Sequence, residues 1–261
     1  MTVLLADAKA VAFENSSYQL PDHFPSDLVY ADDTLILAAE EDSAHTYMLA
    51  IANAGRAYGL QLNWSKCEVL PVNTHGVIKS PEGQDLPVKS SISYLGSTLS
   101  SDGRIATELA RRLGKAKGEF NSLRRVWAHS GVGLARKIQT FNQCVVSGLL
   151  YGLSSAVLGK ASRRKLDGFQ VACLRKILHV PHAYYSRVSN RTVLERARQK
   201  PLSEDLRNEQ KKYYRELLDR ELVDPVRGTI FSQTGQDLRP FPGRRRVGRP
   251  RLTWIASMEC T

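Results

Sequence analysis

The spacing of apolar and polar residues predicts helices and short strands in the first hundred residues. The apolar positions of residues 1–14 predict the end of a helix, and helical spacing over residues 43–58 predicts a second helix. Gly59 follows the second and suits a helix C-terminus. Apolar runs at 28–30 and 34–38 predict a tight hairpin between them.

Further along, residues 60–64 and 67–72 predict a strand, a turn and a strand, and "ISYLGSTLS" at 92–100 predicts a second strand pair. Residues 73–91 read as a polar loop or hairpin. The first hundred residues are therefore expected to form a small α+β unit.

Beyond residue 104 the pattern becomes mostly helical. Helices are predicted at 105–128, 134–150, 162–178, 191–199 and 202–222. The segment "RPFPGRRRVGRPR" near the end holds six arginines, three prolines and two glycines, so it is expected to be extended or flexible.

One uncharged stretch, residues 138–159, raises the question of a membrane span. Asn, Gln, Ser and Gly residues interrupt it, so one or two buried helices are the preferred interpretation. The first ten residues hold too short an apolar run for a secretory signal. No membrane partner is expected.

Charge changes the picture of the second part. The 261 residues have a net charge of +11. Residues 1–100 hold 5 basic and 12 acidic residues, a net −7, and residues 101–261 hold 32 and 14, a net +18. This asymmetry favours a polyanionic partner, most often nucleic acid. A basic surface without a dedicated ligand is the alternative.

The cysteines and histidines give little sign of a zinc site. No two of the four cysteines form a CxxC pair, and their scatter suits a reducing compartment. His179 and His182 form an isolated HxxH, which we interpret as surface histidines.

Two adjacent carboxylates, Asp32 and Asp33, stand inside the apolar run "LVYADDTLIL" at 28–37. Neighbouring carboxylates resist joint ionisation unless a cation lies opposite them. Their hard oxygens suit Mg²⁺, and pairs of such ions promote phosphoryl transfer. An Asp-rich turn without a ligand is the alternative.

The residues around this pair resemble the YADD box of reverse transcriptases. "AYGLQLNWSKCEVL" at 57–70 resembles the helix–strand box that follows it, and "SISYLG" at 91–96 resembles the next box. Four later segments resemble the region beyond the polymerase domain of non-LTR (LINE-type) retrotransposon reverse transcriptases: "GLLYGLSSAVL", "LDGFQVACLRKIL", "SRVSNRTVL" and "RRVGRPRLTW".

The resemblance implies an α+β fold, with a partial polymerase palm at 1–100, a helical thumb-like region at 101–160, a helical C-terminal region at 161–235 and an Arg-rich flexible tail at 236–261. It implies RNA-directed DNA polymerase activity by a two-metal mechanism, with Mg²⁺ or Mn²⁺, dNTP substrates, an RNA template and a DNA primer. By family, the location would be intracellular, in the nucleus or cytoplasm.

The same resemblance assigns roles around the carboxylate pair. Asp32 and Asp33 would be metal ligands and catalytic residues, with Asp32 the stronger candidate. Lys66 would assist the pyrophosphate leaving group, or is an ordinary surface lysine. The residues expected near the primer are Tyr30, Ala31, Tyr94, Leu95 and Gly96, although the last three also suit an ordinary strand end.

Basic residues of the thumb-like region and the tail would contact the phosphates of a template–primer duplex. They are Arg111, Arg112, Lys115, Lys117, Arg124, Arg125, Arg136, Lys137, Arg244, Arg245, Arg246, Arg249 and Arg251. Trp127 would stack on a base, but a core position is the preferred interpretation.

The family's palm also needs an earlier catalytic aspartate, a fingers region and a glycine-containing box, all well upstream of YADD. "LLADAKAVAFE" at 4–14 superficially resembles the missing box, with Asp7 as third ligand. We reject this, because only 24 residues separate Asp7 from Asp32. We therefore expect a truncated enzyme that is inactive alone and lacks an upstream half.

Two other functions stay open. The chain is alternatively a non-catalytic nucleic-acid-binding protein, either a relic or one put to new use. A purely structural interaction module is the third possibility, and it predicts no binding to template–primer at low salt.

Overall fold

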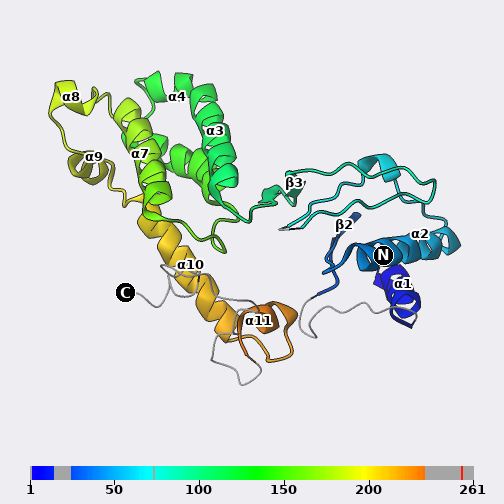
Figure 1. The fold of residues 1–261 in the computed structure, drawn as a ribbon. Helices are drawn as coiled ribbons and strands as arrows, with labels where there is room; N and C mark the ends of the chain where they lie inside the picture. The colour runs from blue at the N-terminus through cyan, green and yellow to red at the C-terminus, as the bar shows by residue number, and fades with distance from the viewer. Residues whose placement is uncertain (1, 15–24, 73, 233–253, 255–261) are drawn as a thin grey trace. The chain divides into compact units, whose positions relative to one another are not determined.

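The computed structural model describes residues 2–14, 25–72, 74–232 and 254, and these form two compact units (Figure 1). The first comprises Met1–Arg104 and Arg220–Gly243, and the second comprises Ile105–Asp219 and Arg244–Thr261. Helices joined to two small antiparallel sheets confirm the α+β class. The domain limits expected at 100, 160 and 235 stay predictions.

The core of the first unit lies between two helices, α1 (Thr2–Glu14) and α2 (Glu41–Ala57), which lie side by side in Figure 1. Leu4, Leu5 and Ala8 of α1 pack against Tyr47 of α2, which is fully buried. Both helices fall where the apolar spacing predicts them.

A Schellman motif ends α2, as the position of Gly59 predicts. The Gly59 N–H donates to the Arg56 carbonyl, and the Leu60 N–H donates to the Gly55 carbonyl. Gly59 has a φ of 70°, in the left-handed region that glycine adopts without steric cost. The sequence signal and the local hydrogen bonds agree here.

The N-terminal unit also contains two hairpins. Strand β1 (Asp27–Tyr30) pairs with β2 (Asp33–Ile36), and β3 (Ser91–Tyr94) pairs with β4 (Ser97–Ser100). Each hairpin forms a two-stranded sheet of its own.

The predicted strands at 60–64 and 67–72 are wrong. Residues 60–63 have no regular secondary structure, the 3₁₀ helix η1 (Trp64–Lys66) follows them, and residues 67–72 contain only an isolated parallel bridge between Val69 and Val88. A strand needs a paired neighbour along its length, and here pairing is limited to one residue. Helix α11 (Pro225–Ile230) also belongs to this unit by residue range and was not predicted.

The second unit is a bundle of helices around one large apolar core. Phe120, Phe141, Leu149 and Leu174 are among its buried residues. Its elements are α3 (Ala106–Ser122), α4 (Arg124–Ala128), α5 (Leu134–Thr140), the π-helical turn η2 (Phe141–Val146), α6 (Ser147–Leu150), α7 (Lys160–Ile177), α8 (Ala183–Ser186), α9 (Asn190–Ala197) and α10 (Leu202–Leu218).

These helices follow the predicted ones with three differences. The helix expected at 105–128 breaks at Leu123 into α3 and α4. The one expected at 134–150 contains the π-helical turn, a local widening of the helix that single-helix periodicity does not signal. Helix α8 was not predicted.

The uncharged stretch at 138–159 contributes Phe141, Val145 and Leu149 to this core, as the buried-helix interpretation predicts. None of the helices in the described ranges combines the length and apolarity needed to cross a bilayer.

Buried amides tie the bundle together. The Gln170 side chain of α7 donates to the Lys200 carbonyl and accepts from the Leu202 N–H at the start of α10. Gln210 of α10 donates to the carbonyls of Leu153 and Ala156. Because buried amides left without partners are costly, Gln170 helps to fix the start of α10 against α7, and Gln210 helps to fix α10 against residues 153–156.

Candidate functional site

The adjacent carboxylates lie at the tip of the β1–β2 hairpin. Tyr30 pairs with Asp33, so Ala31 and Asp32 form a two-residue loop. Ala31 has a φ of 53°, which is unusual for a residue with a Cβ. This tight turn projects two neighbouring carboxylates from one end of a short sheet.

The hairpin itself is open to solvent. Leu28 and Val29 are 41% and 40% exposed and Tyr30 is 64% exposed, and both aspartates are exposed as well. Lys9 of α1 forms an ion pair with Asp27 at the base of β1. The apolar residues beside the aspartates therefore line an exposed ribbon, and the two charges are solvated.

The second hairpin is tied to the first. Leu95 and Gly96 have φ values of 48° and 74°, the positive values typical of a type I′ turn. The Tyr94 hydroxyl donates to the Leu28 carbonyl at 3.0 Å. Burial, and then the negative charge of Asp33, raise the pKa of Tyr94. The structure thus brings Tyr94 near the carboxylate pair, 61 residues along the chain from Asp33.

Asp7 and Lys66 lie on other elements of this unit. Asp7 accepts a hydrogen bond from the Tyr58 hydroxyl at 2.6 Å, and this bond raises the pKa of Tyr58. It therefore links α1 to the end of α2. The Lys66 side chain is exposed at the end of η1, and the backbone N–H of Lys66 donates to the Asn63 carbonyl.

The carboxylate pair fits a hard divalent cation in its chemistry. Asp32 and Asp33 supply oxygen ligands, and Mg²⁺ is commonly held by one or two carboxylates together with water and phosphate oxygens. Among the residues that the structure describes, no cluster of three or more acidic, His or Cys side chains forms a fuller ligand set. The pair therefore offers a partial, solvent-facing set of ligands.

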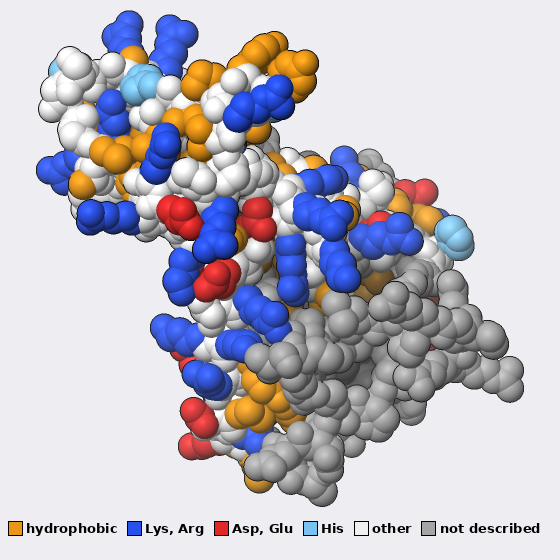
Figure 2. Space-filling model, turned by 90° about the vertical axis from the view of Figure 1, so that its left-hand side faces the viewer, with side chains coloured by type: hydrophobic (Ala, Val, Ile, Leu, Met, Phe, Trp, Pro, Cys, Tyr) orange, Lys and Arg blue, Asp and Glu red, His pale blue; other side chains and the backbone are white. Residues whose placement is uncertain are grey.

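The predicted nucleic-acid contacts divide by burial. Six are exposed on α3, α4 and α5: Arg111, Lys115, Lys117, Arg124, Arg125 and Arg136. The hydrogen bond to Glu108 raises the pKa of Arg111. Figure 2 shows Lys and Arg side chains spread over the visible face of the described residues, with fewer acidic ones.

Two of the predicted contacts, Arg112 and Lys137, are buried. Arg112 forms an ion pair with buried Glu108 and donates to the Gly148 carbonyl. The Lys137 ammonium donates to the Trp127 carbonyl at 2.7 Å. Both side chains serve the interior of the bundle, so we leave them out of the exposed basic surface.

The five arginines predicted in the tail, Arg244, Arg245, Arg246, Arg249 and Arg251, lie outside the described residues. Trp254 is described. Its indole donates to the Ser154 carbonyl at 2.9 Å and packs edge-on against Tyr213 and Tyr214.

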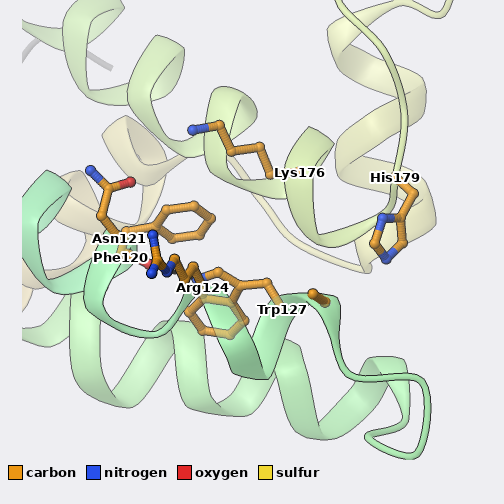
Figure 3. Close-up of a pocket in the computed structure, with 7 residues that line it drawn as sticks. Phe120, Asn121, Arg124, Trp127, Lys176 and His179 are labelled. Carbon is orange, nitrogen blue, oxygen red and sulfur yellow. Dashed lines mark hydrogen bonds between the residues drawn. The ribbon is translucent and has the colours of Figure 1, made fainter.

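A cavity of about 220 Å³ opens between the α3–α4 corner and the end of α7 (Figure 3). Phe120 and Trp127 are stacked with ring centroids 5.1 Å apart and form its apolar wall. Trp127 is buried and donates to the Phe120 carbonyl, as the core interpretation predicts. The rim of the cavity carries the exposed side chains of Arg124, Lys176 and His179.

Sequence patterns did not indicate that Lys176 and His179 line the same cavity as Arg124. The two cations Arg124 and Lys176, with the imidazole of His179, suit an anionic group such as a phosphate. The Lys176 ammonium also lies over the Phe120 ring, 5.7 Å from its centroid. The only sequence signal is the basic end of the predicted helix at 162–178.

Comparison with known proteins gives one match. No curated protein and no solved structure matches the chain. Residues 18–99 match the family model described as reverse transcriptase (RNA-dependent DNA polymerase). This segment contains the carboxylate hairpin and the Tyr94 hairpin up to Leu99. Over these residues the chain is therefore similar to the reverse transcriptase family.

Proposed function

We propose that this chain is part of a LINE-type reverse transcriptase, an RNA-directed DNA polymerase, and that it binds a template–primer duplex. The observation that carries the proposal is the carboxylate hairpin joined to the Tyr94 hairpin within the matching residues. Two segments that resemble the catalytic and primer-holding boxes lie next to each other, as one polymerase site requires.

In this proposal the two hairpins are part of the palm. Asp32 and Asp33 hold Mg²⁺ or Mn²⁺, with Asp32 the main ligand. The bound metal would neutralise charge on the attacking and leaving oxygens of a dNTP. Tyr30 and Ala31 lie under the primer end, and Tyr94, Leu95 and Gly96 contact its backbone. Lys66 assists the leaving group.

The helical unit then contributes the thumb. The exposed basic side chains of α3, α4 and α5, with Arg124, Lys176 and His179 around the cavity, contact phosphates without reading sequence. Gly114 and Gly118 leave open space on α3, which permits close approach of a backbone. These contacts predict an affinity that falls steeply with salt.

Two-metal chemistry in this family uses a further aspartate, and we propose that it comes from an upstream half of the polymerase. We therefore expect these 261 residues to bind template–primer and not to extend it. Primer extension on an RNA template with Mg²⁺ and dNTPs tests this. Robust synthesis that Asp32→Ala abolishes would contradict it.

A binding measurement tests the carboxylates themselves. The variant combines Asp32→Asn with Asp33→Asn, and its affinity for template–primer with dNTP is measured with Mg²⁺ and with chelator. With chelator, two fewer negative charges raise the affinity by about threefold. With Mg²⁺, loss of the ligands lowers it by about tenfold, roughly 1.4 kcal/mol.

The matched control combines Glu82→Gln with Asp85→Asn, which removes two exposed charges from the same unit. We expect it to raise the affinity slightly in both conditions. The reversal of sign with Mg²⁺ is therefore specific to the hairpin. If both variants behave alike in Mg²⁺, the proposed metal role is wrong.

The second candidate is a non-catalytic nucleic-acid-binding protein, either a relic or one put to new use. The difference in packing favours it. Within the described residues the basic helical unit has a large buried core, whereas the hairpin that carries the carboxylate pair is exposed to solvent. It predicts salt-dependent binding. The Asp32 and Asp33 substitutions would then have the same effect on affinity with Mg²⁺ as with chelator.

A further inference from the structure

The loop between α7 and α9 is held in place by one buried arginine. The Arg175 guanidinium donates to the Pro181 carbonyl at 3.0 Å and to the Val188 carbonyl at 2.6 Å. It also donates to the Asn190 side chain at 3.1 Å. Because a planar guanidinium fixes several acceptors at once, both ends of the loop are anchored to α7.

Two tyrosines project from this anchored loop. Tyr184 and Tyr185 of α8 are 68% and 78% exposed. Their ring centroids lie 5.3 Å apart at 88°, an edge-to-face pair. The Arg187 guanidinium lies 5.5 Å from the Tyr184 ring centroid. Since each ring contacts its neighbours mainly through one face or edge, much aromatic surface remains available to a ligand.

The surroundings of the pair are basic. Residues 179–200 contain five Lys and Arg residues and one acidic residue, Glu195. Glu195 accepts from Arg191 at 2.9 Å, so its charge is locally matched. In Figure 1 α8 lies beyond one end of α7, and α9 lies beside α7. Exposed aromatic rings in a positive field complement a strand that carries both phosphates and unstacked bases.

We propose that Tyr184 and Tyr185, with Arg187, form a stacking platform for unpaired bases of single-stranded nucleic acid. The kind of partner rests on the proposed function, but the platform uses none of the residues of the carboxylate hairpin or of the cavity rim. Duplex bases are already stacked on each other, so the platform favours the single-stranded part of a template over the paired part. Arg175 is a positioning residue that holds it.

A protein partner is the competing occupant, because exposed tyrosines also anchor protein interfaces. The net positive charge of the loop and the cation beside Tyr184 favour the polyanion. The two occupants can be told apart, because stacking on the rings requires bases on a nucleic-acid strand and a protein partner does not supply them.

The experiment compares two single-stranded RNA ligands of equal length, one with all its bases and one with abasic sites throughout. Both strands carry the same phosphates. Affinity is measured by fluorescence anisotropy for the intact chain and for a variant that combines Tyr184→Ala with Tyr185→Ala. The matched control combines Tyr184→Phe with Tyr185→Phe, which keeps both rings.

We expect the intact chain to bind the base-bearing strand about tenfold more tightly than the abasic strand, in line with the energy of stacking one base. The alanine variant should lose this preference and bind the abasic strand as the intact chain does. The phenylalanine variant should keep the preference. Circular dichroism checks that all three chains fold alike.

The outcomes separate this proposal from the proposed function. If template–primer binds and the alanine variant keeps the base preference, the platform is wrong and the proposed function stands. If the preference depends on the tyrosines but template–primer does not bind, the platform stands and the proposed function fails. If no RNA binds, both are wrong, and a protein partner becomes the occupant to seek.

Discussion

The two units of this molecule differ in how well they support the residues that carry their chemistry. In the helical unit, exposed basic side chains stand on helices whose inner faces share one large core. In the N-terminal unit, the core lies between α1 and α2, and the carboxylate pair stands on a two-stranded ribbon with exposed Leu28 and Val29. The candidate binding residues are thus carried by well-packed helices, and the candidate catalytic residues are not.

An isolated two-stranded ribbon is marginally stable in water and presents unpaired edges. The carboxylate hairpin has such edges within the described residues, and the proposed upstream half of the polymerase is a natural source of further strands. The helical unit needs no such addition to bury its core. This difference explains why we expect nucleic-acid binding to survive in conditions that leave the carboxylate hairpin poorly ordered.

The first prediction tests the core of the helical unit. Phe141 is fully buried and meets Phe120 edge-to-face at 6.0 Å. We expect Phe141→Ala to lower the free energy of unfolding of this unit by about 3–5 kcal/mol, through lost burial and a cavity. Leu134→Ala in the preceding helix α5 is the control, because Leu134 is exposed and should change stability by less than about 0.5 kcal/mol.

Cysteine labelling reports the effect unit by unit. Burial raises the pKa of the Cys173 thiol to about 12, so at pH 8 this thiol is protonated and shielded until the helical unit opens. Cys67 lies in the N-terminal unit. Phe141→Ala should accelerate alkylation of Cys173 and leave that of Cys67 unchanged. Equal acceleration of both would mean that the units unfold together.

The second prediction concerns the anchored loop. Replacing Arg175 by Met keeps much of the apolar stem and removes the hydrogen bonds to the carbonyls of Pro181 and Val188. We expect local opening of residues 181–190 to become easier by about 2 kcal/mol. Hydrogen exchange should show the loss of protection there. Arg164→Met, at an exposed position of α7, is the control and should have no such effect.

Much of the helical architecture could be predicted from periodicity, because each helix carries its own apolar face. The same periodicity holds an overlooked signal for Arg112. It stands three residues after Leu109 and four before Ala116, both buried, so it lies on the inner face, where Glu108 one turn earlier supplies its counter-charge. A basic residue on the apolar face of a helix is therefore better predicted to form an ion pair in the core than to contact a phosphate.

The nonlocal contacts could not be predicted. The hydrogen bond from Tyr94 to Leu28 joins residues 66 apart, and the cavity needs the packing of α4 against α7. The strands expected at 60–72 failed for the related reason that alternation gives a strand its two faces but not its partner. The local sequence pattern therefore predicted where the carboxylate hairpin lies in the chain. Which residues lie beside that hairpin depends on tertiary packing, which the pattern does not contain.

The third prediction has the smallest effect and compares the units through glycine. Gly168 lies within α7, and a Cβ added there meets nothing within 4 Å. Gly168→Ala should therefore stabilise the helical unit by about 0.5–1 kcal/mol, because alanine loses less backbone entropy on folding. Denaturant unfolding followed by Cys173 labelling measures this gain.

Gly55 in α2 is the counterpart in the N-terminal unit. A Cβ there lies 3.3 Å from the Leu60 carbonyl oxygen, which belongs to the Schellman turn, and 3.8 Å from Leu4 of α1. The backbone at the turn is held by the Leu60 N–H and has little room to move, so Gly55→Ala should give no gain or a small loss. Equal stabilisation by both substitutions would show that the α1–α2 pair is packed more loosely than this close contact implies.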